Sequence, residues 1–189
     1  MQLTLGGWVF LGVMAGLVVL FIATFNRFVA LRQRANEAWS DIDVQLKRRA
    51  DLVPGLVEIV GGYAGHEHAT FADVARWRGA AAEARTPEAR ATAESGLSQA
   101  LRGLLAVIEA YPELKADEGF RALQEQLAAI EADAQSSRRY YNAVVRDLNT
   151  LIEKFPSSLV ASLGGFRQRA FFEIDQPADR QPPRVSFQR

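Results

Sequence analysis

The first charged residue of this chain is Arg27, and the residues before it are uncharged and predominantly apolar. The stretch from Leu3 to Phe25 has about 23 residues, and at about 1.5 Å of rise per residue a helix over it is about 34 Å long. This length exceeds the hydrocarbon core of a bilayer, which is about 30 Å thick. The sequence therefore predicts that residues 1–26 form an N-terminal tail and a transmembrane anchor.

Two other interpretations of this stretch fit less well. A cleavable secretory signal has basic residues ahead of a shorter apolar core. Here no basic residue precedes the run, and three arginines follow it: Arg27, Arg32 and Arg34. A buried helix of a soluble core is rarely apolar over so many consecutive residues. We therefore expect the rest of the chain to work at a lipid surface.

The charges that flank the anchor predict its orientation. Between Arg27 and Arg49 the chain carries six basic and three acidic residues, and the residues before the anchor carry none. By the positive-inside rule, the N-terminus should lie outside and the body in the cytoplasm. Arg27, Arg32 and Arg34 are equally compatible with contacts to anionic lipid headgroups. The expected partner of residues 3–25 is the lipid bilayer itself.

Composition restricts the remaining partners. The 22 basic residues balance the 22 acidic ones, which argues against a nucleic-acid-binding protein because phosphate contacts need a basic excess. Cysteine is absent, so disulfides do not contribute, and this fits either side of a membrane. The spacing of Gly12 and Gly16 lets two anchors approach closely in lipid, which leaves a homo-oligomer open.

The clearest helical pattern lies between Ala116 and Phe155. Apolar or small residues recur there at alternating intervals of four and three, which predicts one long helix with a single apolar seam. Pro112 is expected in its first turn, and Pro156 is expected to end it. The seam comprises Ala116, Phe120, Leu123, Leu127, Ile130, Ala134, Ser137, Tyr141, Val144, Leu148, Leu151 and Phe155.

A second seam of the same spacing leads outward from the anchor. Pro54 interrupts it, so we expect a kink or break between Arg49 and Pro54. Gly61, Gly62 and Gly65 are expected to stop this helix. The seam comprises Phe28, Leu31, Ala35, Ala38, Ile42, Leu46, Arg49, Val53, Leu56 and Val60.

Two more helical segments complete the pattern. One is the short segment from Glu67 to Arg85. The other opens at Thr86 and Pro87, an N-cap residue followed by proline in the first turn. Its apolar stripe comprises Leu97, Leu101, Leu104, Ile108 and Tyr111.

Four helices joined by short turns predict an all-α fold: a single transmembrane helix followed by an up-and-down, antiparallel four-helix bundle with long helices. The bundle domain is expected over residues 27–175. Within it, the apolar stretch from Leu159 to Phe172 is expected to fold back on the end of the bundle. Residues 176–189, which contain three prolines, are expected to form a disordered tail.

Several blocks of this chain resemble the LemA family of bacterial membrane-anchored helical proteins. The first block runs from Ala38 to Pro54, and a second from Gly62 to Glu67. Further blocks begin at Tyr111 and Arg138 and continue to Glu173 in matching order. The residues that match the family pattern are Trp39, Asp43, Gln45, Lys47, Arg48, Arg49, Asp51, Pro54, Tyr63, His66, Glu67, Arg138, Arg139, Tyr141, Asn142, Asn149, Phe155, Pro156, Phe166, Phe172 and Glu173.

The resemblance implies an N-terminal span and a helical bundle at the inner membrane of a bacterium. The family includes proteins associated with magnetosome membranes and with the cell envelope, and the resemblance supplies no catalytic residue. This chain departs from the family pattern at Gly55, Gly61 and Asp117, where Asn, Lys and Asn are usual.

Chemistry-bearing residues are few. His66, Glu67 and His68 are weak candidates for a metal site, because side chains two apart on a helix diverge and an additional carboxylate is needed. Surface histidines near a helix start are the favoured interpretation. The sequence contains no phosphate-binding glycine loop or cysteine nucleophile. We therefore predict no cofactor, no catalytic residue and no enzyme.

Arg49 is the one charged residue inside an apolar seam. A buried arginine needs a carboxylate partner, and the candidates are Asp41, Asp43, Asp51 and Asp147. Alternatively its guanidinium extends along the bundle surface to solvent.

The leading interpretation of function is a membrane-anchored scaffold that binds unidentified membrane or cytoplasmic proteins. One alternative is a regulatory adaptor of an envelope-stress or membrane-protease system, with the segment from Gly61 to His68 as its moving part. A metal-dependent hydrolase is a third interpretation, and only the histidine pair supports it.

Overall fold

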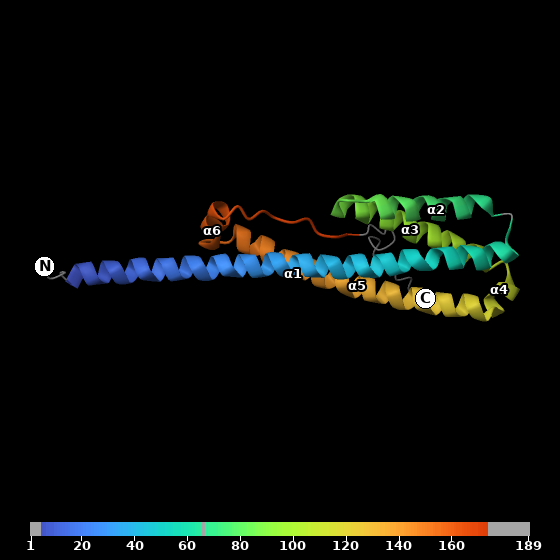
Figure 1. Cartoon of the computed structure of the whole chain (residues 1–189), viewed down its shortest axis with the longest axis horizontal. Helices are drawn as coiled ribbons and strands as arrows, with labels where there is room; N and C mark the ends of the chain where they lie inside the picture. Colours follow the sequence, from blue (N-terminus) through green and yellow to red (C-terminus); the bar gives the residue numbers. More distant parts are fainter. Residues whose placement is uncertain (1–4, 66, 174–189) are drawn as a thin grey trace, which may run out of the picture. The chain divides into compact units, whose positions relative to one another are not determined.

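The described residues form six α-helices and no strand. The computed structural model describes residues 5–65 and 67–173 of the chain (Figure 1). The all-α prediction is confirmed. The helices are α1 (Leu5–Tyr63), α2 (His68–Glu83), α3 (Pro87–Ile108), α4 (Pro112–Ala116), α5 (Glu118–Glu153) and α6 (Ser157–Leu163).

The chain divides into two compact units. Unit 1 combines residues 1–42 with residues 137–171, and unit 2 combines residues 43–136 with residues 172–189. Helices α1 and α5 each contribute a segment to both units.

Unit 2 is a bundle of four helical segments around one core. The later part of α1, α2, α3 and the first part of α5 supply the walls, and α4 supports the turn between α3 and α5 (Figure 1). Short connections of this kind place successive helices antiparallel. The buried residues that pack together are Val53, Leu56, Val60, Ala64, Val74, Leu97, Leu101, Leu104, Ile108, Leu114, Phe120 and Leu127.

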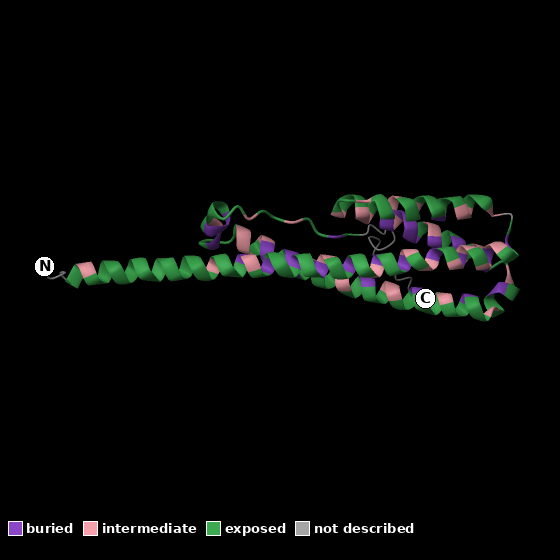
Figure 2. Cartoon of the chain, viewed as in Figure 1, coloured by how far each residue is buried: buried purple, intermediate pink, exposed green. Residues whose placement is uncertain are grey.

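The apolar seams largely match the buried faces. All ten residues of the α1 seam are buried, and those of the α5 seam are buried or half-buried apart from its ends, Ala116 and Phe155 (Figure 2). A continuous row of apolar residues at helical spacing must be covered by other helices, because a single helix has nothing to bury it against. This is why sequence periodicity located these faces.

Capping side chains begin α3 and α5. Thr86 Oγ1 accepts a hydrogen bond from the Ala89 N–H at 3.1 Å, with Pro87 in the first turn, as predicted. The long helix does not begin at Pro112, which instead opens the separate helix α4. Asp117 is extended and its carboxylate accepts from the Phe120 N–H at 2.8 Å, so α5 starts beyond it. The family's usual Asn caps a helix equally well.

Pro54 does not break α1, and the predicted interruption between Arg49 and Pro54 is wrong. Proline lacks an N–H, so it leaves the carbonyl of Ala50, four residues earlier, without its helical donor. Arg78 of α2 replaces that donor, since its Nε lies 3.0 Å from the Ala50 oxygen. Burial of Val53 and Leu56 on either side of the proline also favours a continuous helix.

The predicted glycine stop is confirmed, because α1 ends between Gly62 and Gly65. Helix α1 continues through Gly61 and Gly62 and ends at Tyr63. A short turn then leads into α2, with the Glu67 N–H donating to the Ala64 oxygen at 3.1 Å.

Unit 1 consists of the first part of α1, the last part of α5, α6 and the segment that follows. Its buried cluster contains Phe28, Leu31, Leu148, Val160 and Ala161. This confirms that the stretch after Pro156 folds back on helical partners.

Helix α1 is also the candidate membrane span. It contains an apolar window long enough to cross a bilayer, and none of that window is buried against other described residues. Gly12 and Gly16 have no described atom within 4 Å of an added Cβ. Association of two anchors through them stays a prediction.

Candidate functional site

Arg49 lies inside unit 2 with only 4% of its surface exposed. Its guanidinium forms an ion pair with Glu94 of α3 and donates to Ser98 Oγ at 2.9 Å and to the Glu94 carbonyl oxygen at 3.3 Å. Glu131 of α5 adds a second carboxylate at 3.7 Å. Helices α1, α3 and α5 therefore meet at one guanidinium.

Glu94 is completely buried and joins two arginines. One carboxylate oxygen pairs with Arg49, and the other accepts from Arg90 Nε at 3.0 Å. Arg90 also donates to the Ala81 carbonyl at 2.8 Å and lies 3.4 Å from the Asp43 carboxylate. The result is an Arg49–Glu94–Arg90 triad that contacts four helices.

Pairing of Arg49 is confirmed, but the predicted partners are wrong. Asp41, Asp43, Asp51 and Asp147 do not pair with it, and only Asp43 enters the network, through Arg90. The sequence nevertheless contained a partial signal for Glu94 as the partner of Arg49. Glu94 lies three residues before Leu97 and so extends the apolar stripe of α3 with a carboxylate.

The triad excludes a simple solvent-facing role for Arg49. A buried charge is strongly destabilising unless its partners replace the lost water contacts. Arg49 Nε has no hydrogen-bond partner among the described residues, whereas its two terminal nitrogens are bonded. Arg49 therefore joins α1 to α3 through bonds that lie inside unit 2.

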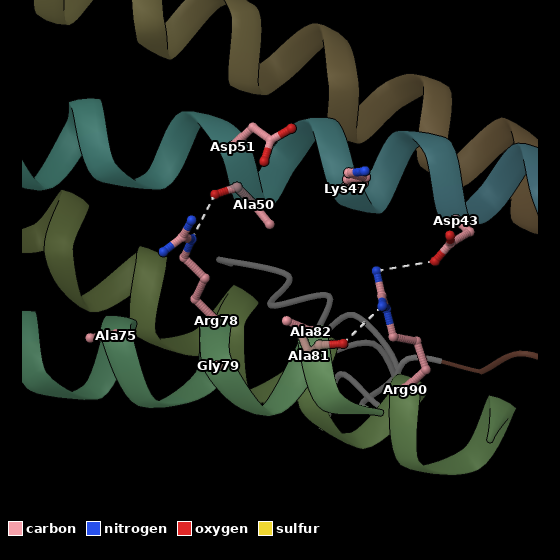
Figure 3. A pocket seen from close by; sticks show the side chains of 10 residues that line it. All are labelled: Asp43, Lys47, Ala50, Asp51, Ala75, Arg78, Gly79, Ala81, Ala82 and Arg90. Carbon is pink, nitrogen blue, oxygen red and sulfur yellow. Dashed lines mark hydrogen bonds and ion pairs between the residues drawn. The ribbon is translucent and has the colours of Figure 1, made fainter. Parts of the chain in front are cut away.

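A cleft of about 480 Å³, lined by small and charged residues, lies beside the triad (Figure 3). Small side chains leave the space, and charged ones surround it. Its lining residues are Asp43, Lys47, Ala50, Asp51, Ala75, Arg78, Gly79, Ala81, Ala82 and Arg90.

Two of the cleft's cations are already engaged. Figure 3 shows Arg78 bonded to the Ala50 carbonyl and Arg90 bonded to Ala81 and Asp43. Arg90 also pairs with Glu94. The side chains of Lys47 and Asp51 form no hydrogen bond or ion pair with any described residue. The ten lining residues include no serine, cysteine, histidine or tyrosine, and Lys47 and Asp51 are the lining charges left available for polar contacts.

A second group of family-pattern residues meets in unit 1. The rings of Trp39 and Tyr141 lie 5.6 Å apart, and the Tyr141 hydroxyl donates to the Ala170 carbonyl at 3.1 Å. Asn149 donates to the Arg169 carbonyl and accepts from the Arg169 N–H, each at 2.9 Å. These paired bonds hold the extended segment after α6 against α5.

Other predicted residues lie apart from both groups. Glu67 and His68 lie at the start of α2, and His66 lies outside the described residues. No three His, Cys, Asp or Glu side chains within residues 5–65 and 67–173 are grouped so as to hold a metal ion. Tyr63 and Phe155 are exposed, and Phe172 is buried.

Sequence reasoning did not single out Arg90, Ser98 or Asn36. Asn36 accepts a hydrogen bond from Arg169 at 2.6 Å, 133 positions along the chain. Such pairs leave no periodic signal, because each joins one polar residue to another at an arbitrary separation.

Comparisons with known proteins agree with the helical architecture. The LemA family model matches residues 38–187. Magnetosome protein MamQ 1 and Magnetosome protein MamQ 2 of Paramagnetospirillum magneticum are each 27% identical to this chain over 195 residues, which cover 87% of the chain and 71% of the relative. Magnetosome protein MamQ of Magnetospirillum gryphiswaldense is 25% identical over 195 residues, again covering 87% of the chain and 71% of the relative.

Proposed function

Because the chain belongs to the LemA family, we propose that it is a non-catalytic scaffold, held in a bacterial inner membrane by the start of α1, whose helical body binds other proteins. The carrying observation is that one helix, α1, contains both an unburied apolar window and a fully buried seam. Lipid covers the first, and partner helices cover the second.

The proposed orientation has the N-terminus outside and the helical body in the cytoplasm. The support for it is the basic excess between Arg27 and Arg49, set against an uncharged N-terminal tail. Relatives named as magnetosome proteins support a role at a bacterial membrane.

Partner binding is favoured over catalysis by the chemistry of the body. The buried charges of unit 2 are bonded to each other, and the cleft beside them presents the charges of Lys47 and Asp51 without a serine, cysteine or histidine. Free charges on a rigid helical surface suit a protein partner of mixed charge, because complementary charges select and orient a partner.

The orientation is tested with single cysteines, which the cysteine-free chain makes unambiguous. Gln2→Cys, ahead of the apolar stretch, reports the outer side, and Gly103→Cys reports an exposed site on α3. In intact spheroplasts, a membrane-impermeant maleimide should label the first and not the second. Permeabilised cells should show labelling of both. The reverse pattern would overturn the orientation.

Partner binding is tested by photo-crosslinking in living cells. Probes replace exposed residues of α5, Gln124 and Gln135, and of the cleft, Lys47. A scaffold should give one or more discrete crosslinked proteins from some of these sites. A membrane protease among them would favour the adaptor interpretation. Failure of every probe to capture a protein at stoichiometric yield would contradict partner binding.

A further inference from the structure

Helix α6 has apolar residues on two faces. Val160 and Ala161 face inward and pack in the unit 1 cluster with Phe28 and Leu31 of α1. Other apolar side chains face solvent: Leu159 and Leu163 on α6 are 58% and 79% exposed, and Phe155, in the turn before the helix, is 75% exposed. These three residues, spaced four apart, are here named the outer row. No described residue covers the outer row.

The outer row lies at the level where the apolar part of α1 ends. Phe166, three residues after Leu163, has its ring 5.4 Å from Phe25 and 4.7 Å from Phe28. The first charge of the chain, Arg27, lies between those two phenylalanines. In Figure 1, α6 accordingly lies beside this stretch of α1.

A glycine cap fixes this position. Gly165 has φ +67°, a left-handed conformation that favours glycine, and the Phe166 N–H donates back to the Ala161 carbonyl at 3.0 Å. The Gly165 N–H donates to the Ser162 carbonyl at 3.4 Å. This pair of bonds is a Schellman motif, which turns the chain sharply at a helix end. The turn brings Phe166 onto α1 and leaves Leu163 outside.

Basic residues flank the outer row along the chain. Between Glu153 and Arg169 the chain carries three basic residues and one acidic residue. The acidic one, Glu153, accepts a hydrogen bond from Gln168 at 2.6 Å. Arg32 lies over the Phe166 ring, with its guanidinium carbon 5.4 Å from the ring centroid. Exposed apolar residues bordered by cations suit the boundary between anionic headgroups and acyl chains.

From this placement we propose that α6 is a second membrane contact, whose outer row inserts into the headgroup and acyl-chain boundary of an anionic bilayer beside the anchor. The inference rests on the proposed anchor, since α1 sets the depth of α6. A lipid surface fits better than a second copy, because the contact of Phe166 with Phe25 holds the end of α6 beside the end of the proposed span. Shallow insertion of about 5–10 Å is typical of such helices.

The proposal is tested on the full chain reconstituted in phosphatidylcholine and phosphatidylglycerol vesicles. An environment-sensitive fluorophore is attached to single cysteines at Leu159→Cys and Leu163→Cys. Lipids carrying a nitroxide near the headgroup or near the chain end serve as quenchers. Ser162→Cys, exposed on the flank of α6, is the matched control. A label at Leu17→Cys is the reference for a position inside the proposed anchor. A label at Gly103→Cys is the reference for a position exposed to water.

Labels at Leu159→Cys and Leu163→Cys should emit at shorter wavelength than the label at Gly103→Cys and be quenched by the shallow nitroxide. The label at Ser162→Cys should be quenched less, and the label at Leu17→Cys should be quenched by the deep nitroxide. Circular dichroism of each labelled chain should match the unlabelled one, because these side chains are exposed.

The outcomes separate the inference from the anchor. If the outer-row labels behave like the Gly103→Cys label while Leu17→Cys is quenched, α6 does not contact lipid and the anchor stands. If Leu17→Cys is not quenched either, the anchor fails as well. If the outer-row emission shifts only as the protein-to-lipid ratio rises, without lipid quenching, a second copy covers the row and the lipid proposal is wrong.

Discussion

At the scale of single residues, the charged network of unit 2 determines which substitutions are severe. Arg49 is one of two arginines that neutralise the fully buried Glu94. Removing one member of a buried ion pair leaves the other charge uncompensated, and the penalty exceeds any gain from a better apolar fit.

We predict that Arg49→Met lowers the free energy of unfolding by about 3 kcal/mol, because Glu94 retains only Arg90 as a partner. The neighbouring exposed Arg48 supplies a matched control, and Arg48→Met should change stability by less than about 0.5 kcal/mol. Urea unfolding of both variants measures the difference. An Arg49→Met chain as stable and monodisperse as the parent would contradict a role in helix register.

Pro54 and Arg78 form a second residue-scale pair. Arg78 donates to the carbonyl that Pro54 leaves without a helical donor. We predict that Arg78→Ala costs about 1 kcal/mol in the native background. The cost should be much smaller in a Pro54→Ala background, since the alanine N–H then reaches the same carbonyl.

A double-mutant cycle measures this coupling directly. Arg76→Ala is the control, because Arg76 lies on the same helix and its contacts are within that helix, with Asp73 at 2.8 Å and the Trp77 ring at 5.0 Å. Its effect should be the same in both backgrounds. Additive behaviour of Arg78 and Pro54 would show that the bond contributes nothing to tolerance of the proline.

At the scale of elements, close packing of α2 on α3 depends on a missing side chain. A Cβ at Gly96 of α3 would lie 2.3 Å from the Trp77 ring of α2. The indole is too rigid to yield by that distance without moving α2. Gly103, on the exposed face of the same helix, has open space around it.

We predict opposite effects for the two glycines. Gly96→Ala should destabilise the chain by about 1–3 kcal/mol through overpacking. Gly103→Ala should stabilise it by roughly 0.5–1 kcal/mol, because alanine favours a helix over glycine. Thermal unfolding followed by circular dichroism at 222 nm compares the two. Equal shifts of both variants would mean that Trp77 does not pack closely on α3.

At the scale of the whole molecule, attachment to membranes should depend on the N-terminal apolar stretch. We predict that the full chain stays with vesicles after alkaline carbonate washing, whereas a chain lacking residues 1–26 is released. The truncated chain should stay predominantly helical, because the α1 seam from Phe28 to Val60 remains to bury its partners. Release of the full chain by carbonate would contradict a transmembrane anchor. Loss of helicity on truncation would show that the helical body needs residues 1–26 to fold.

Local pattern determined much of this architecture. The sequence alone predicted the apolar run, the two long seams and the helix that begins at Thr86 and Pro87. Each of these features depends on the spacing of side chains within one helix. The membership in the LemA family was readable for the same reason, as blocks in a fixed order. The boundaries 27–175 and 176–189 stay predictions, and the latter range lies outside the described residues.

Only the tertiary structure decided which polar residues meet. The sequence by itself indicated that Arg49 must be paired, since it occupies a buried position in a seam. It did not indicate Glu94, because the choice among carboxylates depends on how two separate helices pack. The same holds for Arg78 and the carbonyl freed by Pro54, and for Phe166 on α1. Periodicity describes one helix at a time, whereas these contacts exist only after several helices have packed together.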